Sequence, residues 1–119
     1  MKYLCIVHLD YAVFSTLSAG DLAALEGSNR DYDAELAERG HLVAANGLER
    51  PENGIVIKVR NGEMSMTDGP FSEAREQMAG FLLLEARDMA EVTTLAAGIP
   101  LAQHGRIELR PVYSPATLA

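Results

Sequence analysis

Ile55-Val-Ile-Lys-Val-Arg-Asn-Gly-Glu-Met-Ser-Met-Thr67 is the stretch that decides how this chain folds. Two segments in which apolar and polar side chains alternate flank Asn61-Gly62. Asn-Gly in this setting is the signature of a two-residue type I′ turn. We therefore predict a β-hairpin over residues 55–60 and 63–67. Its apolar side chains share one face, and opposite charges meet across the strands. The predicted cross-strand pairs are Arg60 with Glu63, Val59 with Met64 and Ile57 with Met66.

The chain before the hairpin has the pattern of a strand, a helix and a second strand. Residues 3–8 are apolar on both alternating faces, which is typical of a central strand covered on both sides. Residues 18–39 form the predicted helix: Ser18 opens it with a capping-box pattern and Gly40 ends it. A stripe at spacings of three and four predicts its buried side: Leu22, Leu25, Asn29, Tyr32 and Leu36. Residues 41–48 form the next predicted strand, and residues 51–54 a turn.

The chain after the hairpin repeats this plan. We predict a short helix over Ser72–Gln77 and a second central strand over residues 80–86. A helix follows over residues 88–98, with Asp88 as its N-cap and Gly98 and Pro100 as its stop. Residues 107–112 alternate between apolar and charged side chains, which favours a half-exposed strand at the edge of a sheet.

The order of elements predicts one α+β domain over residues 1–119. Two β-α-β units flank the hairpin, and right-handed crossovers place both long helices on the same side of one sheet. The expected architecture is a ferredoxin-like sandwich with an added β-hairpin, in which the first strand of each unit is central. Helices cover only one face of such a sheet. We therefore predict a homodimer that buries sheet against sheet.

Composition excludes several classes of partner. The 119 residues include 10 basic and 17 acidic side chains, a net charge of −7, and 48% are hydrophobic. Such an acidic surface repels phosphate backbones and anionic lipids, so we expect neither nucleic acid nor membrane as a partner. The single cysteine, Cys5, stands in an apolar run, which favours a buried small hydrophobe over a reactive thiolate. The start of the chain lacks the pattern of a signal peptide, and we expect a cytoplasmic protein.

The turn Thr67-Asp68-Gly69-Pro70-Phe71 is the most unusual local pattern. Its residues suit a rigid turn that aims the chain from the hairpin into the next strand. The alternative is a site in which Asp68 acts as a base or a hydrogen-bond acceptor. The ligand-binding candidates around it are Gly69, Pro70, Phe71, Glu73, Arg75 and Glu76. The same charged residues also suit a solvated helix face, and spacing favours that reading.

Three further side chains are candidates from their positions. His8 ends a central strand, where pockets are common, and is the candidate catalytic partner of Asp68, or else a half-buried structural histidine. Asn29 and Tyr32 lie on the apolar stripe of the first helix and either line a pocket or bond to the backbone. No histidine pair has metal-ligand spacing and no phosphate or dinucleotide motif occurs, so we expect neither metal nor cofactor.

The segments Thr67-Asp-Gly-Pro-Phe-Ser-Glu-Ala-Arg-Glu76, Gly80-Phe-Leu-Leu-Leu-Glu-Ala86 and Ile107-Glu-Leu-Arg-Pro-Val112 together resemble the DGPF branch of the YCII-related family. Met1-Lys-Tyr-Leu and Gly47-Leu48 fit the same resemblance. It implies a dimeric α+β barrel of ferredoxin-like subunits. The superfamily hosts monooxygenases, isomerases and haem enzymes, so the fold does not give a reaction.

The resemblance also bears on mechanism. In the YCII branch proper the proposed active site is a His-Asp pair, and one relative is a dehydrochlorinase. The matching region of this chain, Gly27-Ser28-Asn29-Arg30, has no histidine, so that pair does not carry over. Two hypotheses remain: a small-molecule-binding protein or enzyme with a pocket near the Asp68 turn, or a non-catalytic dimeric regulatory module. The frequent proximity of DGPF genes to sigma-factor genes suggests the second.

Overall fold

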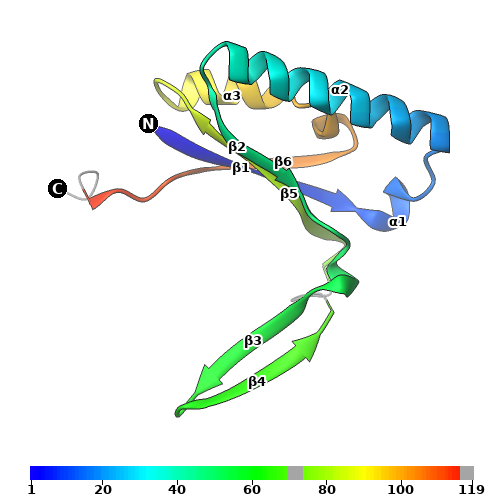
Figure 1. Ribbon diagram of the computed structural model, residues 1–119, viewed down its shortest axis with the longest axis vertical. Helices are drawn as coiled ribbons and strands as arrows, with labels where there is room; N and C mark the ends of the chain where they lie inside the picture. The colour runs from blue at the N-terminus through cyan, green and yellow to red at the C-terminus, as the bar shows by residue number, and fades with distance from the viewer. Residues whose placement is uncertain (70–73, 116–119) are drawn as a thin grey trace.

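The computed structural model describes residues 1–69 and 74–115 (Figure 1). Within these residues, six strands and three α-helices follow one another in this order: β1 (Lys2–Asp10), α1 (Tyr11–Phe14), α2 (Ala19–Glu38), β2 (Leu42–Gly47), β3 (Ile55–Arg60), β4 (Glu63–Asp68), β5 (Glu76–Glu85), α3 (Met89–Ala97) and β6 (Gly105–Pro111). Two short 3-10 turns, Pro51–Asn53 and Pro100–Gln103, precede β3 and β6.

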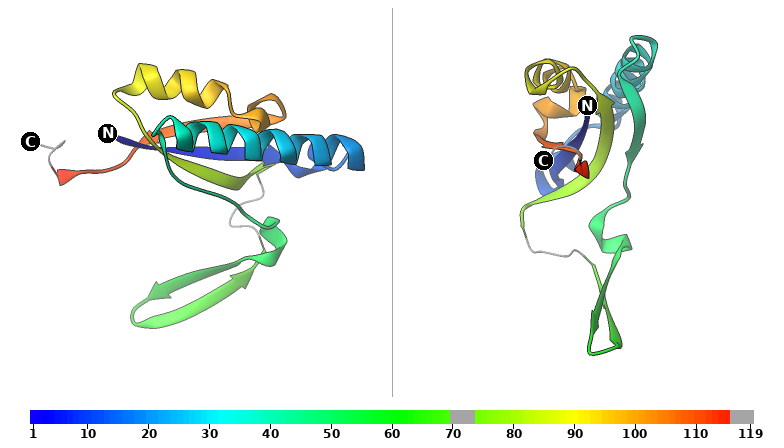
Figure 2. Two further views of the ribbon diagram at one scale, coloured as in Figure 1. Left: turned by 45° about the horizontal axis from the view of Figure 1, so that its top comes forward. Right: turned by 90° about the vertical axis from the view of Figure 1, so that its left-hand side faces the viewer.

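Four strands form one antiparallel sheet in the order β2-β5-β1-β6. The two strands predicted to be central, β1 and β5, are central, and β6 lies at an edge as its pattern indicated. Figure 2 shows α2 and α3 on the same side of this sheet. The chain is thus α+β, and its strand order is compatible with a ferredoxin-like sandwich.

The core lies between this sheet and the two long helices. Odd-numbered residues of β1, such as Cys5 and Val7, point to the helices and are fully buried, while the even-numbered ones from Leu4 to Asp10 are half-buried on the opposite face. Successive strand residues alternate between faces, which produces this division. Leu84 of β5, Leu36 of α2 and Val92 of α3 complete the buried centre. Burial also raises the pKa of the Cys5 thiol to about 11, as expected for an inert buried cysteine.

Both long helices begin and end as their sequences indicate. The Ser18 hydroxyl accepts the backbone N–H of Asp21 at 3.0 Å, and the Asp88 carboxylate accepts that of Glu91 at 2.9 Å. These caps satisfy backbone donors that the first turn of a helix leaves free. Gly40 follows α2 with φ of +80°, a conformation that glycine adopts without strain.

The prediction of a short helix over Ser72–Gln77 is wrong for residues 74–77, which are the part that the structure describes. Glu76 and Gln77 are the first residues of β5, where they lie opposite Asp10 and Leu9 of β1. Both residues favour helices, but backbone pairing with β1 outweighs this preference. The sequence also missed α1, a single turn that follows β1 directly. It is capped by Asp10, whose carboxylate accepts the N–H of Ala12 at 3.0 Å.

The hairpin β3–β4 is a separate two-stranded sheet, which we call the arm (residues 55–68). Its register is the predicted one, with Arg60 opposite Glu63 and Ile57 opposite Met66. Asn61 and Gly62 both have positive φ, as a type I′ turn requires. Figures 1 and 2 show that the arm projects from the body on the side of the sheet opposite the helices.

Candidate functional site

The structure distributes the predicted site residues over separate places. His8, Arg75 and Glu76 line one pocket on the sheet face that lacks helices. Asn29 lines a second pocket between α2 and the sheet. Gly69 lines a third hollow at the base of the arm. The predicted grouping of Asp68 with His8 is therefore absent from the described part of the chain, since Asp68 is exposed at the end of β4 and lines none of these three.

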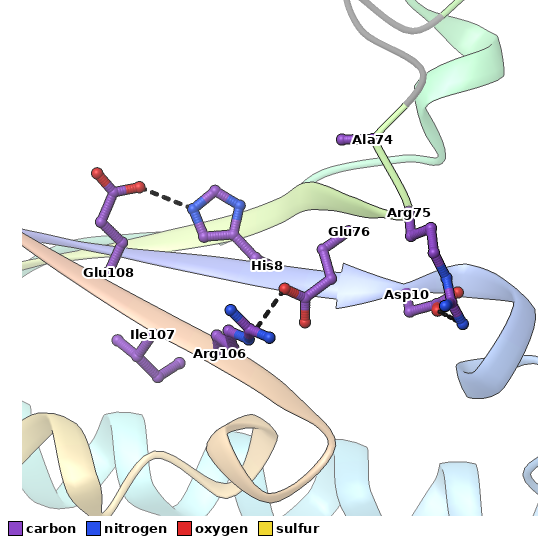
Figure 3. Close-up of a pocket in the computed structure, with 8 residues that line it drawn as sticks. All are labelled: His8, Asp10, Ala74, Arg75, Glu76, Arg106, Ile107 and Glu108. Atoms are coloured by element: carbon purple, nitrogen blue, oxygen red, sulfur yellow. Dashed lines mark hydrogen bonds and ion pairs between the residues drawn. The ribbon is translucent and has the colours of Figure 1, made fainter.

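The first of these, the polar pocket, is an open hollow of about 760 Å³ (Figure 3). A bulge between Val7 and His8 puts Met78 opposite His8 and Glu76 opposite Asp10, so charged residues of β5 join those of β1. Three pairs fill it: His8 Nε2 lies 2.8 Å from Glu108 Oε1, Arg106 Nε 3.2 Å from Glu76 Oε1, and Arg75 Nη2 3.3 Å from Asp10 Oδ2. Each of these six side chains thus already has a polar partner.

The second, the helix pocket, is smaller, at about 290 Å³, and lies between α2 and the sheet. Apolar side chains make most of its wall, among them Val7, Leu82 and Ile99. Strands β2 and β5 approach closely beside it: a Cβ on Gly80 would come within 2.9 Å of the Asn46 carbonyl oxygen, so only glycine fits there. Apolar walls with a few polar groups are the usual composition of a small-molecule site.

Two polar side chains of α2, Asn29 and Asp33, line this pocket. They are four residues apart, so they lie on one side of the helix. Within residues 1–69 and 74–115, neither side chain has a hydrogen-bond or ion-pair partner. Partial burial raises the pKa of the Asp33 carboxyl above its ordinary value, because desolvation disfavours the charged form. These two groups remain available to a molecule that enters.

Sequence reasoning identified Asn29 but missed Asp33. The spacing could have indicated Asp33, because it follows Asn29 by four residues on the helix. However, Asp33 is also next to Tyr32, and the predicted apolar stripe runs through Tyr32 to Leu36. Which of two neighbouring positions faces a cavity depends on how the helix is rotated against the sheet. That rotation is a property of the packed structure.

Tyr32 has the structural role rather than the ligand-binding one. Its hydroxyl donates to the Leu95 carbonyl oxygen at 2.6 Å and so joins α2 to α3. A Cβ on Gly98 would lie 2.5 Å from the same hydroxyl, so the contact requires glycine after α3. Burial is the main cause that raises the pKa of Tyr32 above its usual value.

The Asp-Gly-Pro-Phe turn is only partly described. Gly69 has φ of +83°, and its N–H donates to the Gly54 carbonyl oxygen at 3.1 Å, which closes the base of the arm. The predicted ligand-binding residues Pro70, Phe71 and Glu73 lie outside the described residues. In the described part, Gly69 thus has a clear structural role as the residue that turns the chain out of β4.

Two other kinds of feature are absent from the parts of the chain that the structure describes. No three His, Cys, Asp or Glu side chains among residues 1–69 and 74–115 lie close enough to hold a metal ion. Over the same residues, every helix is too short or too polar to cross a membrane.

Comparison with known proteins finds one matching family and one similar protein. The sequence model of the YCII-related domain matches residues 1–115. An uncharacterized protein of Rhizobium meliloti (strain 1021) is 26% identical over 122 residues, which cover 99% of this chain and 98% of that protein. The two chains thus correspond over nearly all of their lengths.

Proposed function

The chain belongs to the YCII-related family, and we propose that it binds a small molecule in the helix pocket, with Asp33 as its acid–base group. The observation that supports this is the pair Asn29 and Asp33, two polar side chains without partners in the described structure that line a mostly apolar cavity. Both side chains are half-buried and can still bind a ligand that enters the cavity, because neither is committed to a partner within the chain.

The pocket chemistry narrows the ligand class. The walls suit a compact molecule with an apolar body and one or two polar atoms at one end. An amide such as Asn29 both donates and accepts hydrogen bonds, and a carboxyl such as Asp33 accepts them when ionised and also donates when protonated. A ligand hydroxyl, which both donates and accepts, would satisfy both side chains. In an enzyme, the raised pKa of Asp33 favours proton exchange between its carboxyl and that oxygen.

This proposal moves the site away from the Asp68 turn. The polar pocket retains His8, and its 2.8 Å contact with Glu108 makes it the alternative location for acid–base chemistry. There, however, the charged side chains are paired with one another, so a ligand would have to break existing ion pairs. We therefore place the binding site at α2 and retain the polar pocket as the competing location for the test.

A fragment screen by ligand-observed NMR, followed by amide chemical shifts, tests the proposal. Ligands with one carbonyl or hydroxyl on an apolar body are expected to shift the Gly47 and Gly80 amides, which line the pocket. Asp33→Asn should weaken the binding of these ligands about tenfold or more, which corresponds to the loss of one well-placed hydrogen bond to a charged or acidic group. Asp31→Asn is the matched control, because Asp31 is exposed on the same helix.

Two outcomes would overturn this placement. The first is that ligands shift the amides of His8 and Arg106 instead, which would move the site to the polar pocket. The second is that Asp33→Asn and Asp31→Asn weaken binding equally, which would show that Asp33 acts only through its charge.

A second candidate function is a non-catalytic regulatory or interaction module, as some members of the DGPF branch suggest. The observation that favours it is the arm, whose apolar face is exposed to solvent. The absence of any binder in the NMR screen, together with a functional requirement for the arm, would favour this candidate.

A further inference from the structure

Two glycines face each other across the strands that form the floor of the helix pocket. Gly47 of β2 lies directly opposite Gly80 of β5, and Gly80 in turn lies opposite Val7 of β1. Directly opposed residues share one face of a sheet. The Val7 side chain is buried on the face that the helices cover, so a side chain on either glycine would also point toward the helices. Both glycines line the pocket.

The two glycines differ in what their surroundings demand. A Cβ on Gly80 would lie 2.9 Å from the Asn46 carbonyl oxygen and 3.2 Å from the Gly47 Cα, so the close approach of β2 to β5 requires glycine there. A Cβ on Gly47 would meet no atom of the described residues within 4 Å. Gly47 also has the extended backbone of β2, which other residues adopt without strain. Packing and backbone conformation therefore both permit alanine at position 47.

Glycine at position 47 nevertheless weakens the strand that carries it. Glycine loses more conformational entropy on folding than alanine does, and it has no side chain to pack. β2 is an edge strand with β5 as its neighbour in the sheet, so few contacts compensate for this loss. Glycine inside a strand often marks a place where a ligand approaches the backbone closely. Gly47 fits this explanation, because the fold does not require it and it lines a cavity.

Gly47 also lies where the pocket opens. It lines the pocket, yet it is exposed to solvent at the edge of the sheet. Ala45, two residues earlier on the same face, packs against the core, whereas Gly47 has no side chain to fill the space under α2. Asn29 and Asp33 line the α2 side of this space. A molecule that enters from the sheet edge and reaches these two groups therefore passes over Gly47.

We propose that Gly47 determines which molecules the helix pocket accepts, because its missing side chain leaves room for the apolar body of a ligand whose hydroxyl binds Asn29 and Asp33. The inference rests on the proposed function, since it concerns the same ligand in the same pocket. Two opposed glycines leave a bare backbone floor, and a flat ring packs against such a floor more closely than a branched alkyl group. The favoured ligand class is thus a phenol that fits a cavity of about 290 Å³.

The test compares matched glycine substitutions with phenol as the probe, titrated by NMR and followed at the Gly80 amide. Gly47→Ala and Gly47→Val narrow the opening stepwise, whereas Gly20→Ala adds the same methyl group to an exposed glycine near the start of α2, outside the pocket. Gly47→Ala should weaken phenol binding by at least about threefold and Gly47→Val by at least about tenfold, because each added carbon takes space from the ring. Gly20→Ala should bind phenol as the wild type does.

A second probe tests selectivity. Para-tert-butylphenol has the same hydroxyl as phenol and a larger apolar body that extends toward the opening. Gly47→Ala should therefore weaken its binding at least about threefold more than it weakens the binding of phenol. A general disturbance of the pocket would weaken the binding of both probes by the same factor.

Thermal unfolding separates this role from a structural one. Gly47→Ala should melt at the wild-type temperature or slightly above it, because alanine fits the backbone and restricts the unfolded chain. Gly80→Ala should melt at a lower temperature, because its Cβ would come too close to the Asn46 carbonyl oxygen. Weaker binding with undiminished stability is the result expected of a residue that acts on the ligand.

Three outcomes would overturn the proposal. One is that both Gly47 variants bind the two phenols as tightly as Gly20→Ala does; if Asp33→Asn still weakens binding, the proposed function stands and only the role of Gly47 fails. Another is that Gly47→Ala lowers the melting temperature as Gly80→Ala does, which would show that the fold requires the glycine. The last is a wild-type protein that binds neither phenol, and the fragment screen then shows whether the pocket itself still binds a ligand.

Discussion

The strands of the body and of the arm all alternate their side chains between two faces, and each strand has an apolar face, yet these apolar faces have opposite fates. In β1, every second side chain is buried under the helices. In β3 and β4, the equivalent side chains are more than half exposed. The alternation therefore specifies a strand and its two faces, but burial depends on whether another element covers the apolar face.

Among residues 1–69 and 74–115, helices cover one apolar face, that of the four-stranded sheet under α2 and α3. Each β-α-β unit returns its helix over the sheet, so α2 and α3 bury the face that carries Cys5 and Leu84. The hairpin has no crossover helix, because its strands are joined by a two-residue turn. A surface without cover from its own chain is the natural place for contact between chains.

The largest expected effect tests the difference between these regions directly. Leu84→Ala should lower the free energy of unfolding by about 2–5 kcal/mol, since Leu84 is fully buried and leaves a cavity. This loss should not depend on protein concentration. Met66→Ala should instead destabilise the protein only at concentrations where copies associate, because its cover would come from the partner. Urea denaturation at several protein concentrations distinguishes the two, and equal concentration dependence would remove the distinction.

A smaller effect tests how the body holds its two helices together. Tyr32→Phe should cost about 1 kcal/mol of stability, because the Leu95 carbonyl oxygen loses its hydroxyl donor. Tyr113→Phe is the control, as Tyr113 is 69% exposed. The measurement is thermal unfolding of both variants beside the wild type. A Tyr32→Phe variant as stable as the control would show that packing alone joins α2 to α3.

The smallest effect concerns the pH dependence of the helix pocket. Burial raises the pKa of Asp33 in the folded chain, so the folded state binds more protons than the unfolded state just above the ordinary Asp pKa. The free energy of unfolding should consequently fall as pH rises above the ordinary Asp pKa of about 4. Asp33→Asn should lack this part of the fall, whereas Asp31→Asn should retain it. Urea titrations across this pH range measure both, and identical profiles would contradict the assignment.

Much of the fold was predictable because its signals are local. The Asn61-Gly62 turn, the Ser18 and Asp88 caps and the hairpin register all follow from contacts between near neighbours, and the structure has each of them. The prediction of a short helix before β5 failed because a contact distant in sequence decided the structure there. There, pairing with β1, distant in sequence, outweighed the local preference of Glu76 and Gln77.

The candidate site was less predictable than the fold. The sequence grouped His8 with Asp68, but the first lies on the sheet and the second on the arm. The helical stripe in the sequence identified Asn29 as a pocket residue but did not identify Asp33, because periodicity does not determine how a helix is rotated on a sheet. Unpaired polar groups become visible only when every neighbour is in place.

By itself, the sequence determined the α+β class, the two central strands, the helix ends and the hairpin, since these depend on residue type, spacing and backbone preference. Only the tertiary structure decided that the arm projects with its apolar face uncovered, that His8 and Glu108 meet on the open sheet face, and that Asn29 and Asp33 share a pocket under α2. Each of these depends on contacts between segments far apart in the chain, and packing of the whole domain determines such contacts.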